Sequence, residues 1–326
     1  MTEIHGASFR DPSGFVFRRD GRIHRQVNRS FAAHYDHMME SGLYARLVER
    51  GLLLPHEEVD LPPARAEDCH RTLRPQLLPF VSHPYEWSPG MLKDAALATL
   101  AIQREALSFG ATLKDASAYN LQPLDGRMLL IDSLSLERLE EGRAWVAYRQ
   151  FCQHFLAPLA LASRRDVRLL QLLRVHLDGV PLDLAAELLP RSAKLRPGLF
   201  LHLVLHARLQ RRYGGTPEKA PRRRPMSRSA LVALVDGLER LVSALDWAPE
   251  GTQWADYEAE APSYASEARE RKEAIVEAAL SRIAPGTVWD LGANVGVFSR
   301  MALRAGARVM AFDGDPACVE RLWRGA

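Results

Sequence analysis

The stretch that most constrains the fold spans residues 288–298 and reads Val-Trp-Asp-Leu-Gly-Ala-Asn-Val-Gly-Val-Phe. An apolar strand leads into a turn whose distinctive residues are Asp290, Gly292, Asn294 and Gly296. A helical stretch follows, and a second apolar strand, residues 308–312, then ends at Asp313. Strand, turn, helix and strand in this order predict a βαβ unit with parallel strands, and such units bind ligands beyond the carboxyl ends of their strands. We therefore expect a cofactor site in an α/β domain here.

The spacing of the glycines separates two kinds of cofactor. Dinucleotide enzymes favour Gly-x-Gly-x-x-Gly, whose third glycine lets the helix pack closely beside the pyrophosphate. The pattern here is Asp290-x-Gly292-x-Asn294-x-Gly296, without a glycine at the third dinucleotide position. It resembles the first motif of the class I S-adenosylmethionine-dependent methyltransferases, Asp/Glu-x-Gly-x-Gly/Asn-x-Gly. A resemblance to methyltransferases described as nodulation-protein-like rests on three aromatic residues upstream, Trp254, Tyr257 and Tyr264.

The methyltransferase resemblance implies a role for each motif residue. Gly292 and Gly296 leave room for S-adenosylmethionine to lie against bare backbone. Asp290 helps to hold the methionine end of the cofactor. Asp313 accepts hydrogen bonds from both ribose hydroxyls, as an ionised carboxylate can, and Asp315 is the alternative for that role. A generic strand–turn–helix unit and an NAD- or nucleotide-sugar-binding unit stay open as other interpretations.

The implied reaction is displacement at the sulfonium methyl group, to which an enzyme contributes mainly positioning and desolvation. The sequence nominates no catalytic base for an acceptor that must lose a proton. The formal net charge of +3 is small for 326 residues, so we expect a small molecule or glycan as the acceptor in preference to nucleic acid.

The methyltransferase resemblance implies a seven-stranded sheet, and the chain has room for its first two strands. We therefore expect the chain to be a fragment whose strand 287–291 has an unpaired edge. On this basis the 326-residue chain should bind S-adenosylmethionine weakly or not at all, whereas a longer parent should bind it.

The N-terminal part predicts mixed α and β structure. Residues 14–27 alternate in polarity around Asp20-Gly21, which predicts a hairpin. Residues 31–50 and 88–107 have the apolar spacing of helices. Four more helices are predicted between residues 145 and 209.

A second set of polar residues follows the helix 88–107. Asp115 and Asn120 lie five residues apart in a loop, an Asp125-Gly126 turn predicts a hairpin, and Asp132 ends its second strand. Three oxygen-bearing side chains placed in this way can converge on the metal ion of a nucleotide and on a substrate hydroxyl.

On these residues, the segment 14–213 resembles the catalytic half of the protein-kinase-like fold. The resemblance implies Asp115 as catalytic base and Asn120 and Asp132 as metal ligands. The sequence departs from the family pattern, since no His-Arg precedes Asp115, no Phe-Gly follows Asp132, and the Gly-rich loop and the strand lysine are missing. Arg25 lies nearest to the place of that lysine. A small-molecule phosphotransferase, a degenerate kinase-like docking module and an unrelated α/β domain therefore stay open.

We thus expect a chain of α/β and α+β class with three parts. Residues 1–213 form a kinase-like, two-lobed α+β domain, residues 214–228 a basic linker rich in Pro, Gly and Arg, and residues 229–326 the first part of a Rossmann-like methyltransferase sheet. Ser229 is expected to cap the helix that follows the linker.

The composition is that of a globular protein, with 47% hydrophobic and 25% charged residues. The cysteines, Cys69, Cys152 and Cys318, have no metal-ligand spacing and are interpreted as reduced thiols. The sequence has neither a signal peptide nor a run of about 18 apolar residues, so we expect a cytoplasmic protein without a membrane span or a bound metal of its own.

Overall fold

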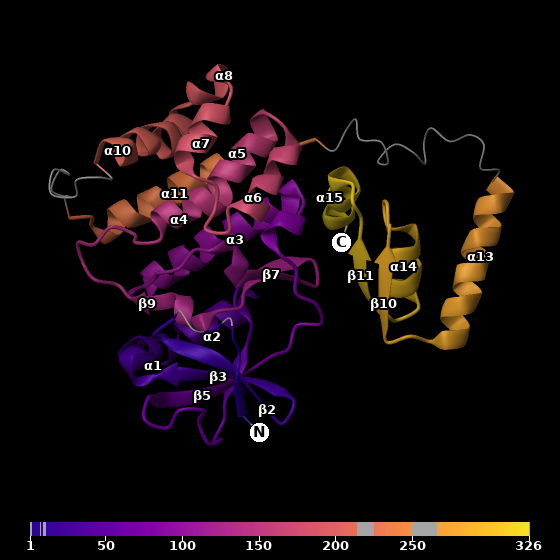
Figure 1. Ribbon diagram of the computed structural model, residues 1–326, viewed down its shortest axis with the longest axis horizontal. Helices are drawn as coiled ribbons and strands as arrows, with labels where there is room; N and C mark the ends of the chain where they lie inside the picture. Colours follow the sequence, from indigo (N-terminus) through magenta and orange to yellow (C-terminus); the bar gives the residue numbers. More distant parts are fainter. Residues whose placement is uncertain (1, 7, 9–10, 214–224, 249–265, 326) are drawn as a thin grey trace. The chain divides into compact units, whose positions relative to one another are not determined.

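The computed structural model describes residues 2–6, 8, 11–213, 225–248 and 266–325. Contacts divide the chain into two units. Unit 1 comprises residues 1–85 and 93–245, and unit 2 comprises residues 86–92 and 246–326. Both units mix helices with small sheets, so the expected mixture of α and β structure is confirmed (Figure 1).

Unit 1 begins with a five-stranded antiparallel sheet of order β1-β2-β3-β5-β4. Its strands are β1 Thr2–Ile4, β2 Gly14–Arg19, β3 Arg22–Asn28, β4 His56–Glu58 and β5 Cys69–Pro75. The predicted hairpin around Asp20-Gly21 is confirmed as β2 and β3. Both turn residues have positive φ, 50° and 76°, which is the conformation that an Asp-Gly hairpin turn requires.

Two helices connect β3 to β4 where one was predicted over residues 31–50. They are α1 Ala32–Glu40 and α2 Leu43–Glu49, and a short 3₁₀ turn, η1 Arg29–Phe31, precedes them. The break lies at Gly42, whose φ of 85° is incompatible with a continuous right-handed helix. The predicted apolar face nevertheless packs inward, because Tyr35, Met38, Leu43 and Leu47 are buried.

The middle of unit 1 holds a long helix and two small antiparallel sheets. The helix predicted over residues 88–107 is confirmed as α3 Pro89–Ser108, of which residues 93–108 belong to unit 1. One sheet pairs β6 Ala111–Leu113 with β9 Leu136–Arg138, and the other pairs β7 Leu121–Leu124 with β8 Arg127–Leu130 across the predicted Asp125-Gly126 turn. Two 3₁₀ turns, η3 Ala118–Asn120 and η4 Ser133–Ser135, flank the β7–β8 hairpin.

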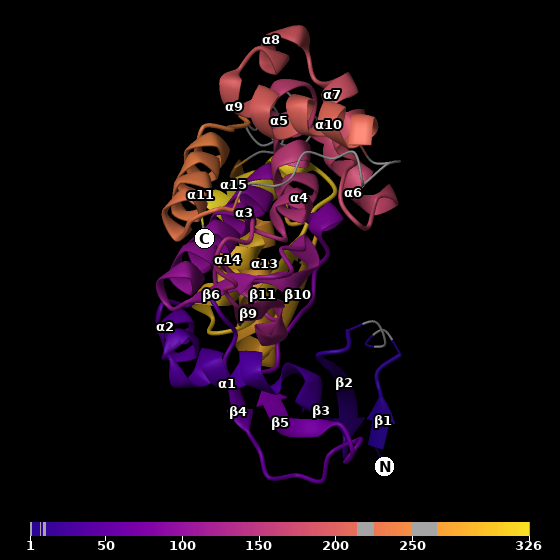
Figure 2. The same ribbon diagram turned by 90° about the vertical axis from the view of Figure 1, so that its left-hand side faces the viewer.

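The rest of unit 1 is helical, as predicted, but its helices are shorter. Two of them contain π-helical segments, η5 and η7, in which the backbone departs from regular α geometry. The elements are α4 Tyr148–Phe151, η5 Cys152–Leu156, α5 Ala157–Arg164, η6 Val167–Gln171, α6 Leu172–Val175, α7 Leu182–Leu188, α8 Arg191–Lys194, α9 Pro197–Leu199, η7 Phe200–Leu205 and α10 His206–Tyr213. In both views they lie beyond the small sheets, on the side away from β1–β5 (Figures 1 and 2).

Helix α11, Arg228–Ser243, belongs to unit 1 by its contacts, although we expected it to open the second domain. Its apolar stripe is buried, and Asp236 pairs with Arg104 of α3 at 2.5 Å. The N-cap is Ser227, which accepts a hydrogen bond from Ala230 N, and not Ser229 as predicted. Most of the expected linker, residues 214–224, lies outside the described residues.

Unit 2 contains the predicted βαβ unit. Its elements are α13 Ser266–Ile283, β10 Thr287–Leu291, α14 Val297–Arg304, β11 Arg308–Phe312 and α15 Pro316–Arg324. β10 and β11 pair in parallel, with Thr287 opposite Arg308 and Leu291 opposite Phe312. The Rossmann-like expectation is met only as far as this two-stranded parallel pair. Within the described parts of the chain, no helix combines the length and the apolarity needed to cross a bilayer.

Two glycines provide a stability test of this fold. A Cβ at Gly14, where β2 begins, would lie 2.2 Å from the backbone oxygen of Gln26, whereas a Cβ at Gly237 in α11 would meet nothing within 4 Å. We predict that Gly14→Ala lowers the free energy of unfolding by about 1–3 kcal/mol, because β2 must move away from β3. Gly237→Ala, the matched control in a helix interior, should raise it by about 0.5–1 kcal/mol. Urea denaturation measures both, and an unchanged Gly14→Ala variant would contradict the pairing.

Candidate functional site

The turn after β10 depends on three residues with positive φ. Gly292, Asn294 and Gly296 have φ of 78°, 49° and 83°. The backbone N–H groups of Gly292 and Ala293 both donate to the carbonyl oxygen of Phe312, at 2.8 and 2.9 Å. The turn is thereby fixed against the end of β11, so the sequence motif and the second strand form one site.

The two glycines have different surroundings. A Cβ added to Gly292 would meet no atom within 4 Å, so this face of the turn is open. A Cβ added to Gly296 would lie 2.2 Å from Leu322 Cδ2 of α15. Gly296 therefore allows α15 to pack against the turn, a role that the motif did not reveal, and Gly292 is the glycine with free space beside it.

Asp313 links the ends of both strands. Its Oδ2 accepts a hydrogen bond from Asn294 N at 2.8 Å, and its Oδ1 accepts one from Asp315 N at 2.8 Å. A carboxylate has about four lone-pair directions, so Asp313 can accept further bonds from a ligand. Asp315 is buried and caps α15 through a bond from Ala317 N, at 2.9 Å, so its carboxylate serves the helix.

Asp290 lies at the end of β10 and is partly exposed. Its Oδ2 accepts a hydrogen bond from Ser299 Oγ of α14 at 2.6 Å, which fixes the direction of the carboxylate. The side chain of Asn294 contacts Cys318, whose Sγ lies 3.7 Å from Asn294 Oδ1. The residues predicted for the cofactor are thus held by neighbouring elements of unit 2.

In unit 1, backbone hydrogen bonds bring the segments of Asp115, Asn120 and Asp132 together. Lys114 N donates to Ser135 O at 2.8 Å, and Ile131 N donates to Asn120 O at 2.8 Å. The loop after β6 and the segment after β8 therefore lie side by side.

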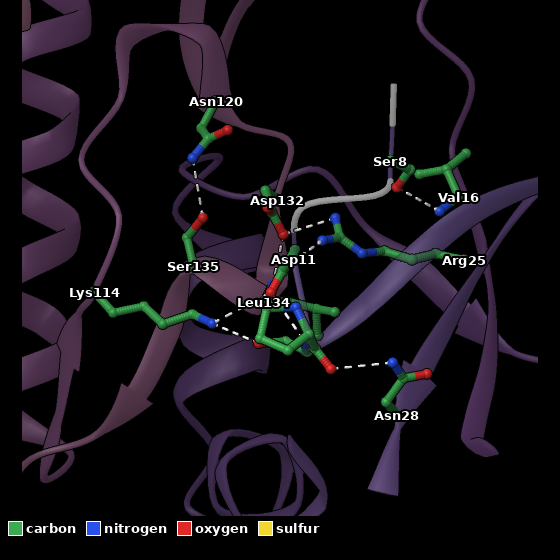
Figure 3. Close-up of polar contacts among 12 residues, drawn as sticks. Ser8, Asp11, Val16, Arg25, Asn28, Lys114, Asn120, Asp132, Leu134 and Ser135 are labelled. Carbon is green, nitrogen blue, oxygen red and sulfur yellow. Dashed lines mark hydrogen bonds and ion pairs between the residues drawn. The ribbon is translucent and has the colours of Figure 1, made fainter. Parts of the chain in front are cut away.

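Each of these three side chains already has a partner within the chain, and Figure 3 shows those of Asn120 and Asp132. Asp115 Oδ1 accepts from Ser117 N at 2.9 Å and from Gln150 Nε2 at 2.8 Å. Asn120 Nδ2 donates to Ser135 Oγ at 3.1 Å. The bond from Gln150 to Asp115 could not be predicted from the sequence, because Gln150 lies on α4, 35 residues further along the chain.

The charge of Asp132 is compensated by Arg25 of β3. Arg25 Nη1 lies 2.7 Å from Asp132 Oδ1, which also accepts a bond from Leu134 N at 2.8 Å. A divalent cation would have to compete with this guanidinium for the same carboxylate. In the described segments, no three His, Cys, Asp or Glu side chains are grouped so that they could hold a metal ion. The residues fit the expected nucleotide-bound metal poorly.

Comparison with known proteins found no matching family model. The chain is 34% identical over 321 residues to the nodulation protein NoeA of Rhizobium meliloti (strain 1021). The match covers 96% of this chain and 67% of the relative. The chain belongs to the NoeA family. The relative's name refers to nodulation and specifies no reaction.

One further residue of this NoeA-family chain lies in the electrostatic field of Asp115. His154, on η5, is 2% exposed, and its ring is perpendicular to that of Tyr119 at a centroid distance of 6.2 Å. Burial lowers the pKa of His154 to about 4, although the charges of Asp115 and Asp178 act in the opposite direction. His154 is therefore neutral at pH 7, and the sequence gave no reason to single it out.

The lowered pKa of His154 predicts a pH dependence of stability. The unfolded chain takes up a proton near pH 6.5, whereas the folded chain does so only near pH 4, so stability falls as the pH decreases through this window. Replacing His154 with Asn should reduce the loss between pH 6.5 and pH 4 by on the order of 1–3 kcal/mol. Equilibrium denaturation across this range measures it, with the exposed His83→Asn as control. Equal slopes for wild type and His154→Asn would contradict the assignment.

Proposed function

We propose that unit 2 binds S-adenosylmethionine and that the protein takes part in methyl transfer to a small molecule or glycan. The observation that carries the proposal is the position of Asp313, a carboxylate at the carboxyl end of β11 that is hydrogen-bonded to the turn after β10. Ligands of open α/β sheets bind at this edge of the strands. The name of the relative, nodulation protein NoeA, supports a role in nodulation. We propose the cytoplasm as the location of the protein.

In this proposal, residues in and beside the turn after β10 contact different parts of S-adenosylmethionine. Gly292 offers open backbone on which the cofactor can lie. Asp313 retains acceptor capacity for the two ribose hydroxyls, and the N–H groups that it already binds keep its carboxylate in place. Asp290, whose carboxylate is directed by the bond from Ser299, is the proposed partner of the methionine end of the cofactor. When bound, the cofactor supplies an electrophilic methyl group.

Acceptor binding would complete the reaction by placing the nucleophile in line with that methyl group. The chain's contribution is to orient the donor and to exclude water, which accounts for much of the catalytic effect in displacement reactions of this kind.

The proposal predicts that Asp313→Ala weakens S-adenosylmethionine binding by about 1.5–3 kcal/mol, the usual value of hydrogen bonds to a charged group. Equilibrium dialysis with radiolabelled cofactor near 1 mM suits this test, because a site that contributes about −4 kcal/mol is half-filled there.

The matched control for this dialysis is Glu273→Ala, which removes one carboxylate from the surface of α13, where it pairs with Arg269. Its cofactor retention should equal that of the wild type. Measurable retention by the wild type that Asp313→Ala does not reduce would contradict the proposed site.

For unit 1, the Arg25–Asp132 ion pair favours a second, non-catalytic role. We propose that the kinase-like segment is a docking module, since its prospective metal ligand is bound to a guanidinium at 2.7 Å. Arg25 lies on the third strand, as the phosphate-binding lysine of kinases does, but an arginine is not equivalent to a lysine in geometry.

A docking role predicts that magnesium causes no further change in the melting temperature of the wild type in the presence of ATP in a thermal-shift assay, because Asp132 is paired with Arg25 and is not available to the metal. Melting of Asp132→Ala in the presence of ATP, with and without magnesium, serves as the control. A magnesium-dependent increase in the wild type that disappears in Asp132→Ala would instead support the phosphotransferase with Asp115, Asn120 and Asp132.

A further inference from the structure

Two cationic side chains of unit 1 lie on either side of one carboxylate. Arg25 extends from β3, and Lys114 follows directly after β6. Between them lies Asp11, in the turn before β2, with Oδ2 3.7 Å from Arg25 Nη2 and Oδ1 3.8 Å from Lys114 Nζ (Figure 3). Three segments that are far apart in sequence thus meet at one charged cluster.

The Asp11 carboxylate is held by its own turn and not by the two cations. Distances of 3.7 and 3.8 Å are too long for hydrogen bonds. Instead, Asp11 Oδ1 accepts a bond from Ser13 N at 2.8 Å, and Lys114 Nζ donates to Ser13 Oγ at 2.6 Å. The carboxylate therefore neutralises the cations at a distance without satisfying their donors.

Arg25 has donor capacity left within this cluster. Its Nη1 is bound to Asp132, but its buried Nε has no hydrogen-bond partner in the described part of the chain. The side chains of Arg25 and Lys114 are only 16% and 24% exposed, and Lys114 Nζ lies 4.4 Å from the centre of the Phe31 ring. Partial burial strengthens their attraction for an anion and raises the cost of an unsatisfied donor.

We propose that Arg25 and Lys114 form a binding site for the phosphate group of a ligand, and that Asp11 occupies this site as an internal substitute anion. A phosphate group carries more negative charge and more acceptor oxygens than a carboxylate, so it can bond to both cations directly. The turn formed by residues 11–13 must move away from the two cations before a phosphate group can bind to them. The site lies in unit 1 and is independent of the cofactor proposed for unit 2.

Asp11→Asn tests the proposal with little structural disturbance. The amide oxygen of Asn can still accept the bond from Ser13 N, while the charge that covers the two cations is lost. With inorganic pyrophosphate as the probe at constant ionic strength, calorimetry should show binding at least about fivefold tighter than in the wild type. This is the change expected when a like charge about 4 Å from the ligand is removed at a solvated site.

Two control pairs separate this site from a general gain in positive charge. Asp125→Asn makes the same charge change at an exposed turn residue with φ of 48°, which Asn tolerates, and should leave pyrophosphate binding unchanged. Adding Lys114→Gln to Asp11→Asn should abolish the gain, whereas adding Lys194→Gln on α8 should preserve it. No gain in Asp11→Asn, an equal gain in Asp125→Asn, or a gain that survives Lys114→Gln would overturn the proposal.

Discussion

The carboxylate of Asp313 is the interaction on which the proposed cofactor site depends. It accepts one backbone N–H from the turn after β10 and one from the turn after β11, so a single side chain fixes both loops at the carboxyl edge of the sheet. Phe312 O adds two further bonds from the first turn. Because these bonds form within the chain itself, the geometry of the proposed ribose site is set before any ligand arrives, which would lower the entropic cost of binding.

In unit 1, the charged side chains near the kinase-like motif are compensated by other side chains of the same unit. Arg25 and Lys114 face Asp11 and Asp132, two cations against two carboxylates. The pairing of Asp132 with Arg25 removes the free carboxylate that metal-assisted phosphoryl transfer requires. Asp11, in contrast, lies 3.7 Å from Arg25 and 3.8 Å from Lys114, so it forms no hydrogen bond with either cation. A docking role and a covered phosphate site are therefore compatible consequences of one arrangement.

Local turn chemistry explains which parts of the fold were predictable from the sequence. The hairpins at Asp20-Gly21 and Asp125-Gly126 and the elements α3, β10 and β11 follow from residues close together in the chain. Features that depend on distant partners were missed or misplaced, because nothing local encodes them. Examples are the packing of Leu322 on Gly296, the contact of Asp115 with Gln150, and the approach of Asp11 to Lys114. The sequence identified the motif residues, but it did not identify the residues from distant segments that contact them.

The most direct test of the central claim is photo-crosslinking of radiolabelled S-adenosylmethionine to the wild-type chain, followed by peptide mapping. The account predicts label in the peptides that contain residues 290–296 or 313–315, and loss of that label when unlabelled S-adenosylhomocysteine is in excess. Label confined to unit 1, or label that the competitor does not displace, would contradict the assignment of the cofactor to the β10–β11 edge.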